Sequence, residues 1–202
     1  MPELTPTIYV VDDDEAMRDS MTWLLEGEGY AVTCFDSAES FLQARHDAMR
    51  GCLVLDVRMP EMSGLELHER LDALGSQLPV IFVTGHGDVP MAVAALQRGA
   101  CDFIEKPFHN EDLLSRIRRA LELDSQLAAR RQRDGAIAHR LEQLTLRERE
   151  VMQLVVAGKL NKQIADELNI SMKTVEAHRA RVMEKMGVRT LAELVKAVVS
   201  LN

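Results

Sequence analysis

The sequence has few aromatic residues and no long apolar run. Only 4% of its 202 residues are Phe, Trp or Tyr, which disfavours a regulator that senses a small molecule in an apolar pocket. No apolar run approaches the roughly 20 residues that span a bilayer, so we expect no membrane segment and no membrane partner. No basic region precedes the apolar residues of MPELTPTIYVV, so we expect a cytoplasmic protein without a signal peptide.

Cysteine and nucleotide-binding motifs are also scarce. The three cysteines, Cys34, Cys52 and Cys101, are odd in number, widely spaced and without a CxxC pair, so we interpret them as small core residues in a reducing compartment. No GxGxxG follows a strand-like run, and the GKL at 158–160 lacks the hydroxyl residue of a phosphate-binding loop. The sequence therefore disfavours both a disulfide scaffold and a nucleotide-binding protein.

Charge is distributed unevenly along the chain. Residues 1–124 carry 23 Asp and Glu against 10 Lys and Arg, whereas residues 125–202 carry 9 against 14. The total formal charge of -8 hides this division. An acidic part followed by a basic part predicts two domains with different partners.

The acidic part alternates strand-like runs with amphipathic segments. Five β-rich runs occupy residues 7–11, 31–35, 52–56, 79–84 and 102–105. The segments between them have apolar residues at helical spacing, and two of these segments begin after the possible N-caps Asp14 and Ser63. This alternation predicts a five-stranded parallel, doubly wound sheet of the flavodoxin-like class. A last helix begins near Asn110 and is expected to break at Gly135, before a linker.

The basic part, residues 141–202, has only helical patterns and predicts four helices. The first opens with a capping box from Thr145 to Glu148. Asn161 is the expected cap of the second, Ser171 that of the third, and the fourth begins at Thr190. Two short helices joined by a tight turn predict a helix-turn-helix.

Polar residues follow four of the predicted strands. Asp12 and Asp13 come after the first strand, Asp56 ends the third, Thr84 the fourth, and Lys106 follows the fifth. Because ligand sites in parallel sheets lie at the carboxyl ends of the strands, we expect these groups to converge. Carboxylates in that number require a cation, for which Mg²⁺ is suited. Asp56 could then act as a nucleophile toward a phosphoryl group.

Four motifs carry a specific resemblance over residues 7 to about 122. VVDDDEAM, LVLDVRMPEMSG, FVTGHGD and FIEKPF, in this order, resemble the receiver domain of two-component response regulators, and TGHGDVP is most similar to the FixJ-like branch. The resemblance implies that Asp56 accepts a phosphoryl group from a sensor histidine kinase. It implies that Asp13, Asp56 and the backbone carbonyl of Arg58 ligate Mg²⁺, with Asp12 acting through water.

The same resemblance implies a conformational switch. Thr84 and Lys106 would contact the phosphoryl oxygens, and Phe103 would rotate together with Thr84. The Lys106–Pro107 bond would be cis, and residues 89–105 would form the homodimer surface of the phosphorylated protein. Arg58 and His86 flank the pocket, and the sequence leaves open whether they tune the phosphoryl lifetime or are plain exposed side chains.

The basic part resembles a LuxR-type helix-turn-helix domain over about 142–200. The segments NKQIA and TVEAHRARVMEKM correspond to its second helix and its recognition helix. We expect Val175, His178, Val182 and Met186 to pack inward, with His178 satisfied and partly buried. The residues expected at double-stranded promoter DNA are Lys162, Ser171, Lys173, Thr174, Glu176, Ala177, Arg179, Ala180 and Arg181. Among them the Lys and Arg side chains are expected at phosphates, and Glu176 at a base edge.

Together these features predict a transcription regulator with a receiver at 5–122, a helical extension and linker at 123–140, and a DNA-binding domain at 141–202. RNA polymerase is the expected further partner. A rival from the enzyme class is a Mg²⁺-dependent phosphohydrolase with an Asp nucleophile. Such enzymes usually place an acid two residues after the nucleophile, where this chain has Arg58. The prediction is therefore not an enzyme but a phosphorylated switch.

Overall fold

A computed structural model describes residues 5–85, 93, 96 and 99–199. The chain divides into two compact units, Met1–Ala128 and Ala129–Asn202. No helix among the described residues is long and apolar enough to cross a membrane. His86 and most of the segment 89–98 lie outside the described residues.

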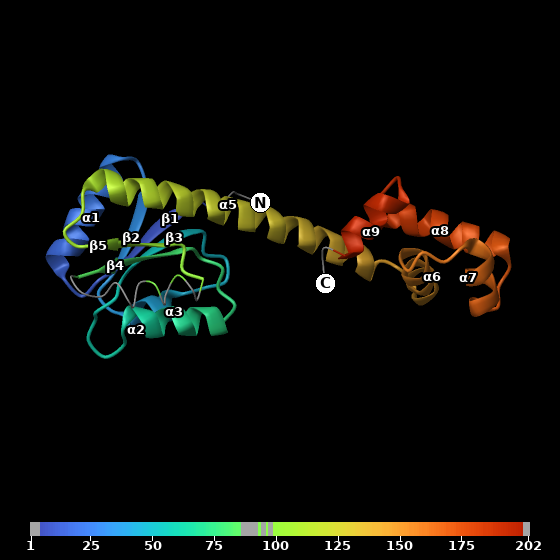
Figure 1. Ribbon diagram of the computed structural model, residues 1–202, viewed down its shortest axis with the longest axis horizontal. Coiled ribbons are helices and arrows are strands. Elements are labelled where there is room, and N and C mark those ends of the chain that lie inside the picture. The colour runs from blue at the N-terminus through green and yellow to red at the C-terminus, as the bar shows by residue number, and fades with distance from the viewer. Residues whose placement is uncertain (1–4, 86–92, 94–95, 97–98, 200–202) are drawn as a thin grey trace. The chain divides into compact units, whose positions relative to one another are not determined.

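The first unit is built on a five-stranded parallel sheet with the order β2-β1-β3-β4-β5 (Figure 1). Its strands are β1 (Thr7–Val11), β2 (Ala31–Phe35), β3 (Gly51–Asp56), β4 (Val80–Thr84) and β5 (Asp102–Glu105). Every neighbouring pair is parallel. The predicted doubly wound sheet is confirmed, and the observed strands differ from the predicted runs by at most one residue.

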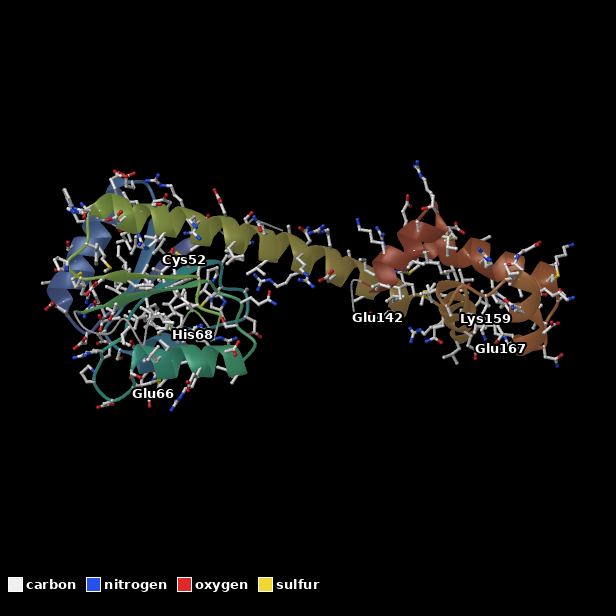
Figure 2. All side chains as sticks on the ribbon, in the orientation of Figure 1. Cys52, Glu66, His68, Glu142, Lys159 and Glu167 are labelled. Atoms are coloured by element: carbon white, nitrogen blue, oxygen red, sulfur yellow. The ribbon has the colours of Figure 1, made fainter. Side chains whose placement is uncertain are left out.

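Helices cover both faces of this sheet (Figure 1). They are α1 (Glu15–Gly27), α2 (Ala38–Ala44), α3 (Gly64–Ala73) and the first part of α5 (Asn110–Glu142). Leu25 of α1 and Ile117 of α5 share one apolar core with the sheet, whereas Phe41 of α2 and Leu67 of α3 share the other. Figure 2 shows Cys52 on the α5 side of the sheet and His68 on the α3 side. All six residues of β3 are buried, so β3 is a central strand that is covered on both faces.

Caps at the predicted positions begin two of these helices. The Asp14 side chain accepts a hydrogen bond from the Ala16 N–H. Ser63 and Glu66 form a complete capping box at the start of α3. Both caps satisfy N–H groups that the first helical turn leaves without a backbone partner, so the loops after β1 and β3 end at defined points.

A buried ion pair joins the amino end of β3 to α5. The Arg50 Nε lies 3.2 and 2.9 Å from the two carboxylate oxygens of Asp124. The Asp124 side chain is only 1% exposed, whereas that of Arg50 is 26% exposed. A carboxylate buried so deeply requires a cationic partner; sequence reasoning did not single out this pair.

The second unit is helical and contains α6 (Leu146–Val156), α7 (Asn161–Leu168), α8 (Met172–Met186) and α9 (Leu191–Val199). Its apolar core includes Val151 of α6, Ile164 of α7 and Val182 of α8. Ile137 and Leu141 of α5 pack against the same core. The four predicted helices are confirmed.

The prediction of a break at Gly135 was wrong, because α5 runs without interruption to Glu142. A glycine inside a helix costs about 1 kcal/mol relative to alanine. The flanking residues LAARRQ and AIAHRLE are rich in strong helix formers, which offsets that cost. The helical extension therefore continues without an irregular linker up to Glu142.

Two of the three predicted caps in the second unit are confirmed. Thr145 forms a capping box with Glu148, and Ser171 caps α8 through the Thr174 N–H. The cap of α7 was misplaced by one residue: Leu160 holds the cap position, and its N–H bonds to Gln163 Oε1 at 2.9 Å. A glutamine that reaches back supplies the partner, so a polar cap side chain is not needed there.

Hydrogen bonds join the carboxyl end of α5, and Gln143 just after it, to the end of α8. The Arg140 Nη1 donates to the carbonyl of Met186 at 2.9 Å, and the Lys185 Nζ donates to the carbonyl of Gln143 at 3.2 Å. Lys185 also bonds the buried Glu148 carboxylate at 2.6 Å. The bonds to Met186 and Gln143 satisfy carbonyls that helix ends leave without a backbone partner.

Candidate phosphorylation site and nucleic-acid interface

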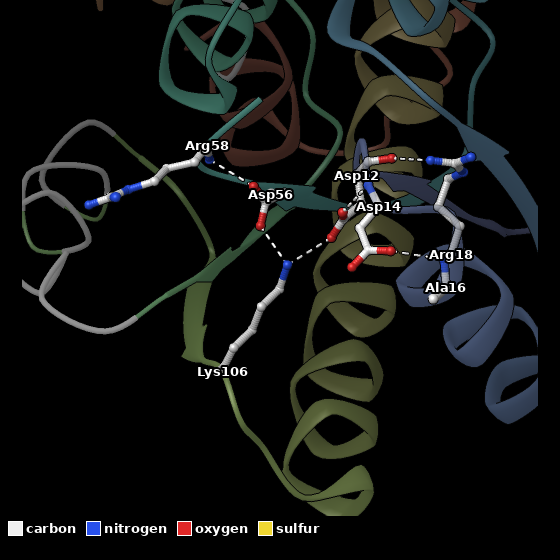
Figure 3. A network of polar contacts seen from close by, with 7 residues as sticks. All are labelled: Asp12, Asp14, Ala16, Arg18, Asp56, Arg58 and Lys106. Atoms are coloured by element: carbon white, nitrogen blue, oxygen red, sulfur yellow. Dashed lines mark hydrogen bonds and ion pairs between the residues drawn. The ribbon is translucent and has the colours of Figure 1, made fainter. Parts of the chain in front are cut away.

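Lys106 lies between two buried carboxylates at the carboxyl edge of the sheet (Figure 3). Its Nζ is 2.7 Å from Asp56 Oδ1 and 2.9 Å from Asp12 Oδ2. Asp12 is 2% exposed and Asp56 is 7% exposed. The parallel strands β1 and β3 are neighbours, so both acids reach one ammonium group, as the strand-end argument predicts.

Burial and charge act against each other at this cluster. Burial, and secondarily the Asp12 charge, raise the pKa of Asp56, although Lys106 and the Arg58 N–H oppose that shift. Burial acts to lower the pKa of Lys106, but the hydrogen bonds and charges of Asp56 and Asp12 outweigh it and the pKa is raised. Lys106 is thus held as a cation. The negative charge of ionised Asp56 is destabilised by burial, and perturbed carboxylates of this kind are typical of reactive sites.

The loop after β3 holds the second oxygen of Asp56. The Arg58 N–H donates to Asp56 Oδ2 at 2.8 Å, and the Gly64 N–H donates to the Val57 carbonyl at 3.1 Å. A Cβ at Gly64 would lie 2.1 Å from the Asp56 carbonyl oxygen. Only glycine allows this close approach, so Gly64 belongs to the construction of the site.

Thr84 and Phe103, the predicted switch residues, lie on neighbouring strands. Thr84 ends β4 and is 1% exposed, and its backbone carbonyl accepts a hydrogen bond from the Lys106 N–H at 2.7 Å. Phe103 lies on β5, is partly buried and packs against the core that faces α2 and α3. The Lys106–Pro107 peptide bond is cis.

Asp13, the predicted metal ligand, is exposed beside the buried Asp12. No three Asp, Glu, His or Cys side chains among the described residues form a ready-made metal site. The donor set nevertheless fits a hard cation, because carboxylate oxygens converge where positive charge is already accepted from Lys106. Arg58 bonds Asp56 through its backbone N–H, and its carbonyl stays a predicted ligand.

Arg18 is a contact that the sequence reasoning missed. Its Nη1 donates to the Asp12 carbonyl oxygen at 2.7 Å from the second turn of α1 (Figure 3). The only sequence signal is a cation six residues after the first acid, and this is common on helices that carry no such contact.

The predicted recognition helix, α8, exposes the side chains assigned to DNA. Val175, Val182 and Met186 are buried as predicted. The exposed positions are Lys162 on α7, Ser171 at the cap of α8, and Lys173, Glu176, Ala177, Ala180 and Arg181 on α8. A helix with charged and small residues outward and an apolar face inward can enter a major groove.

Two further residues of this surface, Thr174 and Arg179, have hydrogen bonds within the protein. Thr174 Oγ1 lies 2.8 Å from Ser171 Oγ, and the Arg179 Nη1 donates to Asn161 Oδ1 at 2.6 Å. His178 is partly buried as predicted, but its buried Nδ1 has no hydrogen-bond partner among the described residues. The expectation that His178 is satisfied was therefore wrong for this nitrogen, because its inward packing brings no donor or acceptor within reach.

Sequence comparisons match both units to known families. Residues 8–118 match "Response regulator receiver domain", and residues 142–198 match "Bacterial regulatory proteins, luxR family". The chain is 45% identical over 196 residues to the response regulator protein TodT of Pseudomonas putida strain F1, covering 97% of this chain and 86% of that protein. It is 47% identical over 189 residues to the transcriptional regulatory protein FixJ of Bradyrhizobium diazoefficiens, covering 94% and 92%.

A structural comparison agrees with these matches. The response regulator StyR superposes with a TM-score of 0.84 at 44% identity, covering 97% of this chain and 99% of that one. A parallel sheet with an acid cluster at its carboxyl edge, followed by a LuxR-type helical unit, defines the class of two-domain response regulators. This chain belongs to that family, in the FixJ-type branch with a LuxR-type DNA-binding domain, and is a phosphorylation-controlled regulator of transcription.

Proposed function

We propose that Asp56 is the phosphoacceptor of this regulator and that a sensor histidine kinase is its phosphodonor. The observation that carries the proposal is the Lys106 ammonium held between Asp56 and Asp12. In the transfer an Asp56 oxygen forms the new P–O bond while the P–N bond to the donor histidine breaks. The receiver domain would span residues 5–122, the helical extension and linker 123–140, and the DNA-binding domain 141–202.

The chain's own groups would prepare Asp56 for this transfer. The Arg58 N–H fixes one carboxylate oxygen, and Lys106 supplies positive charge next to the other. Lys106 and the Thr84 hydroxyl would then bind the oxygens of the phosphoryl group. Asp12, Asp13, Asp56 and the carbonyl of Arg58 would hold Mg²⁺, which supplies charge neutralisation at the phosphoryl group when bound.

Phosphorylation labelling tests this assignment. Wild-type protein with Mg²⁺ and a small phosphodonor should gain one acid-stable, base-labile phosphoryl group, detected by intact-protein mass spectrometry. Asp56→Asn should gain none, whereas Asp72→Asn, an exposed position on α3, should be labelled like the wild type. Equal labelling of Asp56→Asn would reject Asp56 as the acceptor.

We further propose that phosphorylation shifts the protein toward a homodimer through residues 89–105 and toward promoter binding by α8. Part of that dimer surface lies outside the described residues, so sedimentation of phosphorylated and unphosphorylated protein is the direct test. The DNA-bound dimer would contact RNA polymerase. We expect the protein to be cytoplasmic.

Two positions on α8 separate phosphate contacts from base contacts. Lys173→Ala should flatten the dependence of log K on log salt by about 0.9 and weaken operator and unrelated DNA alike. Glu176→Ala should leave the slope nearly unchanged and alter preference at one base pair by about 1–3 kcal/mol. Lys196→Ala, an exposed lysine on α9, is the matched control. A base-preference change in Lys173→Ala with only a slope change in Glu176→Ala would mean that α8 is rotated relative to the proposal.

A further inference from the structure

We infer that Arg18 is a positioning residue for the proposed cation site: it fixes the peptide group that joins Asp12 to Asp13. This inference rests on the proposed function, because it assigns Arg18 a part in holding Asp13 toward Mg²⁺. Arg18 lies on α1 rather than in the acidic loop, and it reaches that loop through the Asp12 carbonyl.

The first step concerns how completely Asp12 is held. Its N–H donates to the Phe35 carbonyl at 3.3 Å, and its Oδ1 and Oδ2 accept from the Asp14 N–H and the Lys106 Nζ at 2.9 Å each. Its backbone carbonyl accepts from Arg18 at 2.7 Å. Every polar group of Asp12 is therefore hydrogen-bonded, and the Arg18 bond is the one that fixes its carbonyl.

The second step follows from the geometry of the peptide bond. The Asp12 carbonyl and the Asp13 N–H belong to one planar group. Rotation of that plane would change the direction in which the Asp13 side chain leaves the backbone. On the other side, the Asp14 carboxylate is bonded to the Ala16 N–H at 2.9 Å. Hydrogen bonds therefore hold the residues on both sides of Asp13, and Arg18 is the donor that holds the carbonyl before it.

A charge effect of Arg18 would act in the opposite direction. A guanidinium beside an acidic loop repels a divalent cation, so its removal by electrostatics alone would tighten Mg²⁺ binding. Removal of a positioning contact would weaken it, since outer partners of metal ligands typically contribute 10–100-fold in affinity. The sign of the change in Mg²⁺ affinity thus separates the two roles.

The experiment measures Mg²⁺ affinity of the full chain by isothermal titration calorimetry, without a phosphodonor. Arg18→Met removes donor and charge and should weaken Mg²⁺ binding about tenfold or more. Arg18→Lys keeps the charge and one donor and should recover part of the loss. Arg118→Met is the control, because Arg118 is an exposed α5 arginine paired with Glu111 at 3.6 Å, and it should bind Mg²⁺ like the wild type.

Far-UV circular dichroism checks that each variant keeps its helices, and Arg18→Lys serves if Arg18→Met fails to fold. Unchanged or tighter Mg²⁺ binding in folded Arg18→Met, or in Arg18→Lys where only that variant folds, would overturn the positioning role. If the wild type itself neither binds Mg²⁺ nor accepts a phosphoryl group, the proposed function fails first. A wild type that does both, with an Arg18→Met protein that binds Mg²⁺ equally well, refutes this inference alone.

Discussion

Replacement of Lys106 by methionine should destabilise the receiver unit in the absence of divalent cations. The change keeps most of the side-chain volume but leaves Asp12 and Asp56, both nearly inaccessible to solvent, without their shared cation. Because the pKa of Lys106 is raised in the folded protein, its stabilising contribution is fully present at neutral pH. It is lost only as the pH rises through that raised value, above the ordinary 10.5.

The contacts set the size of the effect. Removing one member of a buried ion pair costs about 3–5 kcal/mol, because the remaining charge stays buried. The Lys106 side chain is 25% exposed, and water can reach the edge of the sheet. We therefore expect the lower end, about 3 kcal/mol. Mg²⁺ should reduce this loss of stability, because a bound cation would replace the missing ammonium charge beside the two acids. If the variant binds Mg²⁺ ten times more tightly than the wild type, the loss shrinks by about 1.4 kcal/mol.

Urea unfolding with and without Mg²⁺, followed by circular dichroism and by hydrogen exchange in β1 and β3, measures these quantities. Arg118→Met controls for loss of an exposed cation from the same unit. A Lys106→Met protein as stable as the wild type in metal-free buffer would show that the ammonium does not compensate the two acids. If Mg²⁺ leaves the difference in free energy of unfolding between the two proteins unchanged, Mg²⁺ and the Lys106 ammonium do not compensate the same acids.

Three further substitutions test separate parts of the structure. Asp56→Asn should raise the free energy of unfolding at neutral pH without Mg²⁺. Because the folded pKa of Asp56 is raised, the cost of its ionisation appears as the pH rises from its ordinary 3.8 through the folded value, so denaturation at pH 4 and 7 should show the gain growing. Gly64→Ala should cost about 2 kcal/mol or more and slow phosphorylation, because its Cβ would overlap the Asp56 carbonyl; wild-type labelling rates would contradict this. Glu148→Gln should lower stability by about 1 kcal/mol at neutral pH. The hydrogen bond from Lys185, and then the Thr145 N–H, lower the pKa of Glu148, so the difference in thermal unfolding should disappear as the pH falls below its ordinary 4.5 through the folded value.

The sheet could be predicted closely because its signals are local and agree. Each strand is a short apolar run, and Ser63 and Thr145 mark helix starts by side-chain chemistry. The convergence of Asp12, Asp56 and Lys106 follows from parallel strands, whose carboxyl ends share one edge. The failure at Gly135 arose because one glycine is a weak signal against many strong helix formers.

Other contacts depend on where long side chains reach, which spacing does not determine. Arg50 and Asp124 are 74 residues apart, and neither lies in a motif. Arg18 could bond any of several acids around it, and only the folded loop selects the Asp12 carbonyl. The Leu160 cap of α7 was missed for a related reason, since its partner Gln163 acts from inside the helix.

The attachment of the last turn of α5 to α8 has a consequence for where the chain can be cut. The luxR family match begins at residue 142, yet Ile137 and Leu141 belong to the apolar core of the second unit. Arg140 closes the carboxyl end of α8 through the Met186 carbonyl. A DNA-binding fragment that began at residue 142 would lack Ile137, Leu141 and Arg140, because the apolar core of the second unit extends at least five residues upstream of the family match.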